Sequence, residues 1–272
     1  IVIADNCAKY ANIIFNNSSE YSGSTLVLGA IFFTFQIYGD FSGYSDIAIG
    51  TSRLFGFNMK QNFAFPYFSR DIAEFWRRWH ISLSTWFRDY LYIPLGGSRG
   101  GTWNKIRNVF IIFIVSGFWH GANWTFMVWG ALNALYFLPI FITNNNRNNL
   151  SIVARGKYFP NVKEFLSMSL TFGLTVFAWI FFRANNVEHA IKYITDIFSS
   201  SLFSIPEIRP SNMPFLILFL LLIEWRGRNN KHALTFNSNK KFYLLRWVLY
   251  IFIMLLIFSY GGKEQQFIYF QF

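Results

Sequence analysis

The sequence predicts an all-α, multi-pass transmembrane helical bundle, and three observations support this fold class. Of the 272 residues, 53% are hydrophobic, 22% are aromatic and only 14% are charged, a composition too apolar for most soluble domains of this size. The apolar residues gather into long runs, which are typical of helices that cross a bilayer. One segment between these runs is rich in both Trp and Arg, which predicts an interfacial or re-entrant helix.

Charge and cysteine content exclude several other classes of protein. The single cysteine, Cys7, excludes an intrachain disulfide framework and a metal site built from cysteines. The formal net charge of +11 would suit a nucleic-acid partner, but no basic amphipathic module or known binding motif accompanies it. Lys and Arg retained in cytoplasmic loops explain the positive charge more simply, so no nucleic-acid partner is predicted.

Seven apolar segments are predicted to build the bundle. They are residues 24–40, 41–57, 108–120, 122–142, 166–184 and 213–225, with a further one at 244–260. The run 109–142 contains no Asp, Glu, Lys or Arg. As one helix it would be about 50 Å long, well beyond a hydrocarbon core of about 30 Å. We therefore predict a break at Gly121-Ala122-Asn123, in surroundings of protein or of a water-filled cavity.

Loop charge predicts the orientation of the second half of the chain. Residues 143–165 hold four Lys or Arg against one acid, and residues 226–246 hold six against none. Residues 185–212 instead hold two basic residues against three acids. Since positive charge is retained in the cytoplasm, the two basic loops are predicted inside, and the middle loop and the tail from Gly261 outside.

The Trp- and Arg-rich segment within residues 66–107 is too charged to cross lipid and too aromatic for a free loop. On a helical wheel, one face carries Ile72, Phe75, Trp76, Trp79, Leu83, Trp86, Phe87 and Tyr90. The other side carries Arg77, Arg78 and Arg88. His80 lies at the edge of the aromatic face. Ser69 or Asp71 can cap the start of this predicted helix, and the stretch 94–97 ends it.

Two histidines are candidates for acid–base chemistry. His120 is the only conventional group in 109–142 that titrates near neutral pH. It is either hydrogen-bonded between helices or a general base, because apolar surroundings favour the neutral form that accepts a proton. His80 is either a membrane-interface anchor among Trp and Arg or a second group in the same cavity.

The arginines and one aspartate have competing interpretations. Arg77, Arg78 and Arg88 can hold the phosphates of an anionic donor or contact lipid headgroups. Asp40 follows a fourteen-residue apolar run, and a buried carboxylate there needs a partner such as Arg53 or a Tyr hydroxyl. The neighbouring small residues fit close helix packing, so a structural role for Asp40 is favoured.

Two further sites are rejected on context. The stretch "GGSRG" (96–100) fits the G-x-S-x-G pattern, but a nucleophile elbow needs a strand before it and a helix after it. His80 and His120 lack a third ligand at recognisable spacing, so no metal site is predicted.

Several long motifs occur in an order that resembles a known family. "FWRRWHISLSTWFRDYLYIPLGG" followed by "GFWHGANWTFMVWG" is similar to the signature region of the membrane-bound O-acyltransferase (MBOAT) family. "YGDFSGYSDIAIG" and the closing "FIYFQF" resemble its bacterial alginate and peptidoglycan O-acetyltransferase branch. The resemblance extends from about Tyr38 to the last residue.

The resemblance implies a fold and a reaction. It implies one membrane-embedded domain over 1–272, a bundle around a central funnel, from which several N-terminal helices are missing. His120 matches the principal catalytic histidine and would take the proton from an acceptor hydroxyl. His80 matches the second histidine and would orient His120 or the donor. Asn123 would either help hold the oxyanion or cap a helix.

The resemblance also implies surroundings and partners. The protein would lie in the bacterial cytoplasmic (inner) membrane and use acetyl-CoA as a substrate, with no bound cofactor. It would hand acetyl groups to an extracytoplasmic acetyltransferase partner that acts on a polysaccharide. D-alanyl transfer to teichoic acid from a carrier protein is an alternative. Two other classes stay open on the residues alone, a proton-coupled transporter and a non-catalytic assembly subunit.

Overall fold

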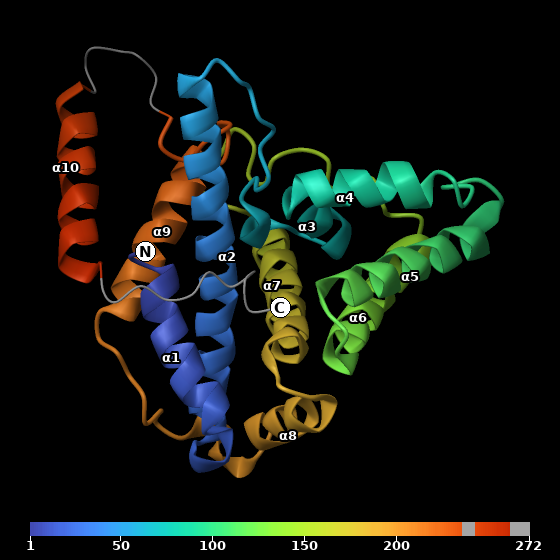
Figure 1. The fold of residues 1–272 in the computed structure, drawn as a ribbon, viewed down its shortest axis with the longest axis horizontal. Helices are drawn as coiled ribbons and strands as arrows, with labels where there is room; N and C mark the ends of the chain where they lie inside the picture. Colours follow the sequence, from blue (N-terminus) through green and yellow to red (C-terminus); the bar gives the residue numbers. More distant parts are fainter. Residues whose placement is uncertain (236–242, 262–272) are drawn as a thin grey trace. The chain divides into compact units, whose positions relative to one another are not determined.

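The computed structural model describes residues 1–235 and 243–261, and within them it contains helices and no strand, as the sequence predicts (Figure 1). The α-helices are α1 Ala4–Asn16, α2 Gly23–Leu54, α3 Ile72–Arg78, α4 Ile81–Phe87, α5 Gly101–His120, α6 Trp124–Ile142, α7 Val162–Arg183, α8 Val187–Ile197, α9 Met213–Gly227 and α10 Tyr243–Tyr260. Of these, α2, α6, α7 and α10 are long and apolar enough to cross a membrane. The closing "FIYFQF" and part of the predicted cytoplasmic loop 226–246 lie outside the described residues.

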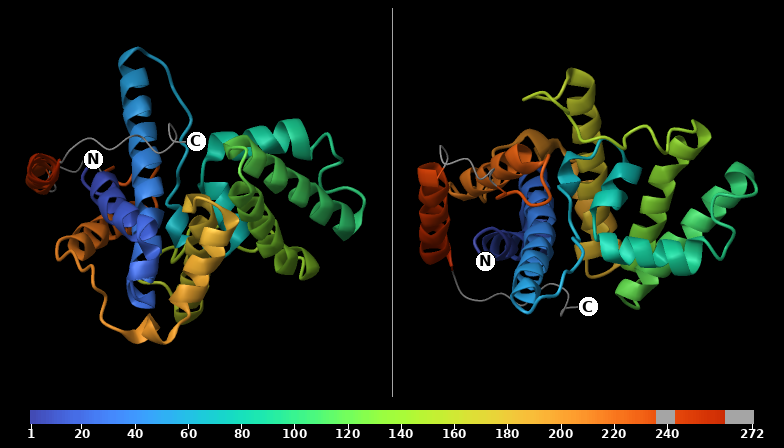
Figure 2. Two further views of the ribbon diagram at one scale, coloured as in Figure 1. Left: turned by 60° about the horizontal axis from the view of Figure 1, so that its bottom comes forward. Right: turned by 90° about the horizontal axis from the view of Figure 1, so that it is seen from above.

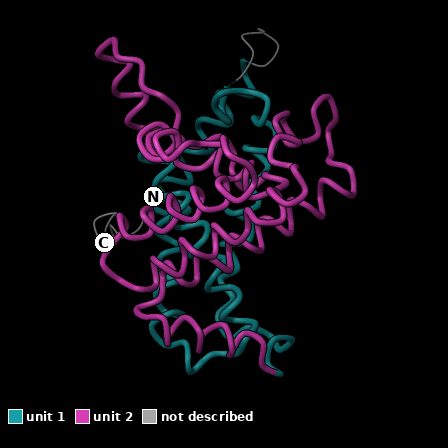
Figure 3. The backbone as a smooth tube through the Cα atoms, turned by 90° about the vertical axis from the view of Figure 1, so that its right-hand side faces the viewer, with its two compact units in different colours: residues 1–44, 200–271 teal, residues 45–199, 272 magenta. Residues whose placement is uncertain are grey.

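The chain divides into two compact units (Figure 3). One contains residues 1–44 and the described part of 200–271, which form α1, most of α2, α9 and α10. The other contains residues 45–199, which form α3 to α8. Both histidines of interest belong to the second unit.

In the first unit, aromatic rings and a buried acid hold the helices together. Tyr10 of α1 packs on Phe32 of α2 with ring centroids 5.7 Å apart. The Tyr38 hydroxyl of α2 donates to buried Glu224 of α9 at 2.5 Å. At the start of α2, Glu207 accepts hydrogen bonds from the hydroxyls of Ser22 and Thr25, and these bonds lower the pKa of its carboxyl to about 2.

The predicted segments 24–40 and 41–57 are wrong as separate elements, because α2 runs unbroken from Gly23 to Leu54. The glycines there do not break the helix. Gly39 faces α1, where an added Cβ would make an ordinary contact, 3.5 Å from the Cβ of Ala4. Asp40 is only partly buried rather than buried, so the cost of a fully buried carboxylate does not arise there.

In the second unit, α5 and α6 run side by side as a helical hairpin (Figure 2). Two glycines allow the backbones to approach closely. A Cβ on Gly117 of α5 would lie 2.3 Å from the carbonyl oxygen of Phe126, and one on Gly130 of α6 would lie 2.3 Å from that of Phe113. Small residues at such contacts are typical of helices that pack in membranes. The hairpin turns at residues 121–123, where the sequence predicted a break.

The predicted single helix through the Trp- and Arg-rich segment is wrong in one respect. α3 ends at Arg78, His80 adopts a left-handed conformation with φ of 44°, and α4 begins at Ile81. The eight apolar residues therefore do not share one face. Trp79 is buried, whereas Trp86 and Tyr90, beyond the turn, are 53% and 69% exposed. Asp71 caps the start of α3 by accepting from the Glu74 amide, as predicted.

Candidate active site

The turn between α5 and α6 is built from residues that end one helix and begin the next. His120 is the last residue of α5, and Gly121 follows with φ of 156°. Asn123 then caps α6, because its side-chain oxygen accepts from the Thr125 amide at 3.1 Å. A Cβ on Gly121 would lie 2.8 Å from the ring of Phe126, so the turn has no room for a side chain.

His120 lies among aromatic rings from three helices. Its ring centroid is 5.3 Å from that of Trp129 on α6, 5.0 Å from that of Phe182 on α7 and 4.9 Å from that of Trp119, all in edge-on geometry. On a fourth side, the ring centroid of Phe126 lies 6.3 Å from that of His120. The residue is 9% exposed. These rings leave little room for water around the imidazole, and apolar surroundings of this kind favour an uncharged group.

His80 occupies the other helix break of this unit. Its carbonyl accepts from the Ser84 amide at 2.9 Å, and its Nδ1 lies 3.5 Å from the hydroxyl of Ser82. Burial lowers the pKa of the His80 imidazole to about 4. Burial thus favours the uncharged form of this imidazole at neutral pH.

A continuous cluster of rings joins the neighbourhoods of the two histidines. Trp79, next to His80, packs on Trp179 of α7 with centroids 5.2 Å apart. Trp179 stacks on Trp129 at 5.7 Å, and Trp129 contacts His120. The structure thus connects the two predicted site residues through α3, α6 and α7. A cavity that holds both histidines stays a prediction.

Each of the three predicted donor-binding arginines already contacts groups of the chain. Arg78 binds Glu74 at 2.8 Å and the Ala64 carbonyl at 3.0 Å. Arg77 is exposed and donates to the backbone carbonyls of Asn146 and Asn149, each at 3.2 Å. Arg88 pairs with Asp89 at 2.7 Å, where both side chains are well exposed. Binding of donor phosphates by these arginines stays a prediction.

Glu74 was not singled out from the sequence. It lies on α3 and pairs with Arg78, the last residue of that helix before the break at His80. Its side chain is 1% exposed and pairs with Arg70 at 3.0 Å and with Arg78 at 2.8 Å. The signal was the spacing of Glu74 and Arg78, since residues four apart on a helix face one another; Arg70 precedes α3. Phe182 was also missed, because it lies 62 positions beyond His120 and only tertiary packing brings the two together.

The sequence predicted neither a nucleophile elbow at "GGSRG" nor a metal site at the histidines. The stretch "GGSRG" connects the π-helical turn Arg88–Tyr92 to α5 and follows no strand. Among the described residues, no group of three or more His, Cys, Asp or Glu side chains is placed to hold a metal ion.

Comparison with known sequences decides the family. The sequence profile of the membrane-bound O-acyltransferase family matches residues 4–181. The chain belongs to the membrane-bound O-acyltransferase family. The match covers the hairpin of α5 and α6 with His120, the His80 break, and the Trp179 end of the ring cluster.

Two of the named relatives fall in the branch that the motifs resemble. The chain is 41% identical over 225 residues to a probable alginate O-acetylase of Pseudomonas aeruginosa, a match that covers 83% of the chain and 41% of the relative. It is 39% identical over 194 residues to a peptidoglycan O-acetyltransferase of Helicobacter pylori, covering 71% of the chain and 35% of the relative. A teichoic acid D-alanyltransferase of Streptococcus thermophilus is 38% identical over 116 residues, 40% of the chain and 28% of the relative. The chain thus spans about two fifths or less of the length of these relatives.

Proposed function

We propose that this chain carries the catalytic histidines of an O-acyltransferase that supplies acetyl groups for the O-acetylation of an exported or cell-envelope polysaccharide. The observation that carries the proposal is His120 at a helix break, buried among rings that adjoin the neighbourhood of His80. Membership of the family and the names of the alginate and peptidoglycan relatives support the type of reaction.

In the proposed reaction, His120 acts as general base. The oxygen of an acceptor hydroxyl attacks the carbonyl carbon of an acetyl thioester while the imidazole takes the hydroxyl proton. The carbon–sulfur bond then breaks, and the thiolate leaves with the proton that the imidazolium returns. Proton transfer of this kind typically contributes about 10²–10⁴-fold to the rate. Water must be kept away because it would compete with the acceptor, and the surrounding rings serve this purpose.

Two other residues have proposed supporting roles. The uncharged imidazole of His80 would hold the donor or the acceptor by a hydrogen bond. Asn123 already donates to the Asn185 carbonyl at 3.0 Å and caps α6. Only its second N–H is left to serve an oxyanion, so we propose that Asn123 mainly fixes the geometry of the turn.

The donor, the location and the partner belong to the same proposal. Acetyl-CoA in the cytoplasm would be the acyl donor, with the enzyme in the bacterial inner membrane and an extracytoplasmic acetyltransferase as partner. The apolar helices α2, α6, α7 and α10 support the membrane location. The likeness to a teichoic acid D-alanyltransferase favours D-alanyl transfer from a carrier protein as the second candidate.

The test follows labelled acetyl transfer from acetyl-CoA to envelope polymer in membranes that contain the full-length protein and its partner. We expect His120→Ala to lose at least about 10²-fold of the transfer rate while it inserts and folds as wild type, with His80→Ala less impaired. Transfer at the wild-type rate in both variants would refute the assignment and favour a transporter or an assembly subunit. Labelled D-alanine on a carrier protein, tested in parallel, distinguishes the second candidate.

A further inference from the structure

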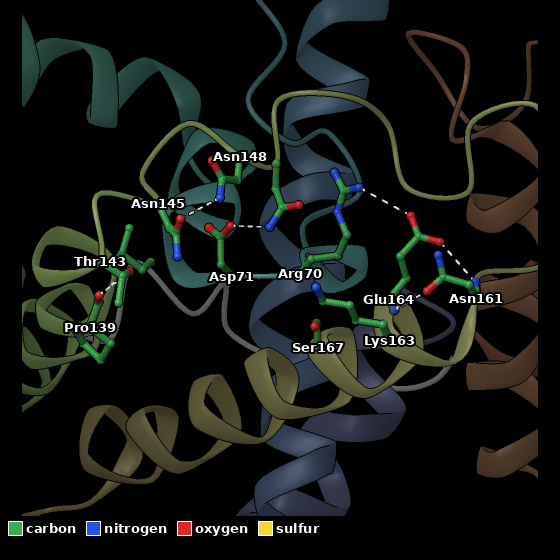
Figure 4. Close-up of a pocket in the computed structure, with 12 residues that line it drawn as sticks. Arg70, Asp71, Pro139, Thr143, Asn145, Asn148, Asn161, Lys163, Glu164 and Ser167 are labelled. Atoms are coloured by element: carbon green, nitrogen blue, oxygen red, sulfur yellow. Dashed lines mark hydrogen bonds and ion pairs between the residues drawn. The ribbon is translucent and has the colours of Figure 1, made fainter.

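A polar pocket lies away from the histidines, at the opposite ends of α6 and α7 (Figure 4). Its volume is about 560 Å³, and it is lined by the start of α3, the end of α6, the loop after α6 and the first turns of α7. A cavity of this size suits a small ligand or a headgroup. None of the residues assigned to the reaction lines it.

The position of the pocket along the helices indicates its depth in the membrane. Thr143 directly follows the last residue of α6, and Lys163 is the second residue of α7. Both helices are apolar enough to cross a bilayer. Their ends therefore lie where hydrocarbon gives way to headgroups and water.

Most charged groups of the pocket already have partners. Arg70 donates to Glu74, to Glu164 and to the Ser151 carbonyl. The two oxygens of Asp71 accept from the Glu74 amide and from Asn149, each at 2.6 Å. Those of Glu164 accept from Arg70 and from the backbone amides of Ala154 and Asn161. Neither carboxylate is thus left to capture a cation.

Besides the side-chain N–H groups of Asn161, whose oxygen caps α7, three hydrogen-bond donors of the lining remain without a partner in the part of the chain that the structure describes. They are the ammonium of Lys163, the hydroxyl of Ser167 and the side-chain N–H groups of Asn145, whose oxygen accepts from Asn148 at 2.7 Å. Lys163 and Ser167 are four residues apart on α7 and share a face. In Figure 4 the Lys163 chain extends above Ser167 toward Asp71.

These three donors have the chemistry of an oxyanion site. A cation beside neutral donors binds a charged oxygen strongly, and lysine is a common ligand of phosphate. The amino end of α7 lies at the same place, but its capping box of Asn161 and Glu164 already occupies it, so the three side chains carry the site. The two carboxylates of the lining disfavour an anion in general, but their oxygens face the donors that hold them.

We propose that this pocket binds a phosphate group at the membrane interface, either the phosphodiester of a lipid headgroup or a soluble phosphate ester. The proposal does not depend on the reaction proposed above. It assigns Lys163, Ser167 and Asn145 a role that neither histidine shares.

The test measures binding to the purified full-length protein in detergent. The probes are dioctanoyl-phosphatidylglycerol, dioctanoylglycerol with the same chains but no phosphate, and inorganic phosphate. The variants are Lys163→Gln and Ser167→Ala, with Arg155→Gln as the matched control, because Arg155 lies in the loop that precedes α7 but does not line the pocket. Thermal midpoints show that each variant is folded.

We expect the phosphate-bearing lipid to bind saturably and Lys163→Gln to weaken it roughly tenfold, as for the loss of one charge-assisted hydrogen bond. Arg155→Gln should bind as wild type. Displacement by inorganic phosphate would identify a soluble ester as the ligand, and its failure to displace would identify a headgroup. Equal binding of dioctanoylglycerol, or wild-type binding by Lys163→Gln and Ser167→Ala, would overturn the proposal.

Discussion

The breaks at His120 and His80 bring two histidines to one cluster of rings by different means. At His120, the chain turns through Gly121, and the next helix starts with the Asn123 cap. At His80, no glycine or proline assists, and the histidine itself adopts φ of 44°. A side chain with a Cβ is strained in that conformation. The turn at His80 must therefore be held by its surroundings.

The surroundings of the two breaks differ accordingly. The His120 turn rests on close helix contact, with Gly117 against the backbone of α6. The His80 turn lies between two backbone hydrogen bonds to a neighbouring segment, from the Ala64 amide to the Arg78 carbonyl and from the Ile81 amide to the Asn62 carbonyl. Buried Glu74, held by Arg70 and Arg78, adds ion pairs just before the turn. Strained backbone at a functional site persists where the surrounding structure over-determines it. The comparison teaches that one histidine is placed by close helix contact and the other by hydrogen bonds and ion pairs of the residues beside it.

The largest expected effect concerns the charged support of the His80 break. Glu74→Gln should lower the free energy of unfolding by about 3 kcal/mol, because it leaves two arginines without their buried carboxylate. It should also reduce acetyl transfer, since the turn at His80 loses its support. Thermal unfolding in detergent and the transfer assay measure the two effects.

The control for Glu74 is Asp89→Asn, which breaks the exposed Arg88–Asp89 pair. Solvent screens such pairs, so its thermal midpoint should match that of wild type. Equal effects of the two substitutions would show that the buried ion pairs do not hold the turn.

The next effect concerns the close contact at the His120 break. Gly117→Ala would place a Cβ 2.3 Å from the Phe126 carbonyl oxygen, so α5 and α6 must separate. We expect a loss of about 1–3 kcal/mol in unfolding free energy and slower transfer. Gly173→Ala on α7 is the matched control, since a Cβ there meets nothing within 4 Å. If both glycine variants behave alike, close packing does not place His120.

A smaller effect on stability distinguishes the contribution of the His80 backbone conformation from that of its imidazole. His80→Gly and His80→Ala both remove the ring, but only glycine adopts the left-handed conformation without strain. We expect His80→Gly to be more stable than His80→Ala by about 1 kcal/mol. Chemical unfolding of the two variants measures the difference. Equal stability would mean that the turn carries no strain.

A pH dependence of stability is expected from the same residue. The pKa of His80 is lowered from 6.5 to about 4 by burial. Between these values the unfolded chain binds a proton that the folded protein excludes, so stability must fall as the pH drops from 6.5 to 4. His80→Asn should flatten this part of the stability curve. An unchanged slope in that variant would assign the acid sensitivity to other groups.

The sequence predicted the features that local chemistry determines. Gly121 and Asn123 end and begin helices in most contexts, so the turn beside His120 was predictable from those residues. His80 has no such signal, and neither does the continuity of α2 through Gly39 and Gly43. These features depend on tertiary packing, which overrides local preference. The contact of Phe182 with His120 was also out of reach, because apolar periodicity does not say which ring meets which.

The short connection between α5 and α6 has a consequence for biogenesis. The hairpin is formed by neighbouring segments, so it can pair as soon as residue 142 has left the ribosome and entered the bilayer. At that stage the imidazole of His120 is covered by Trp119, Phe126 and Trp129 but not by Phe182. Only insertion of α7 closes the last side. The aromatic surroundings of His120 are therefore assembled in two steps of translation, the second of which can be delayed without loss of the first.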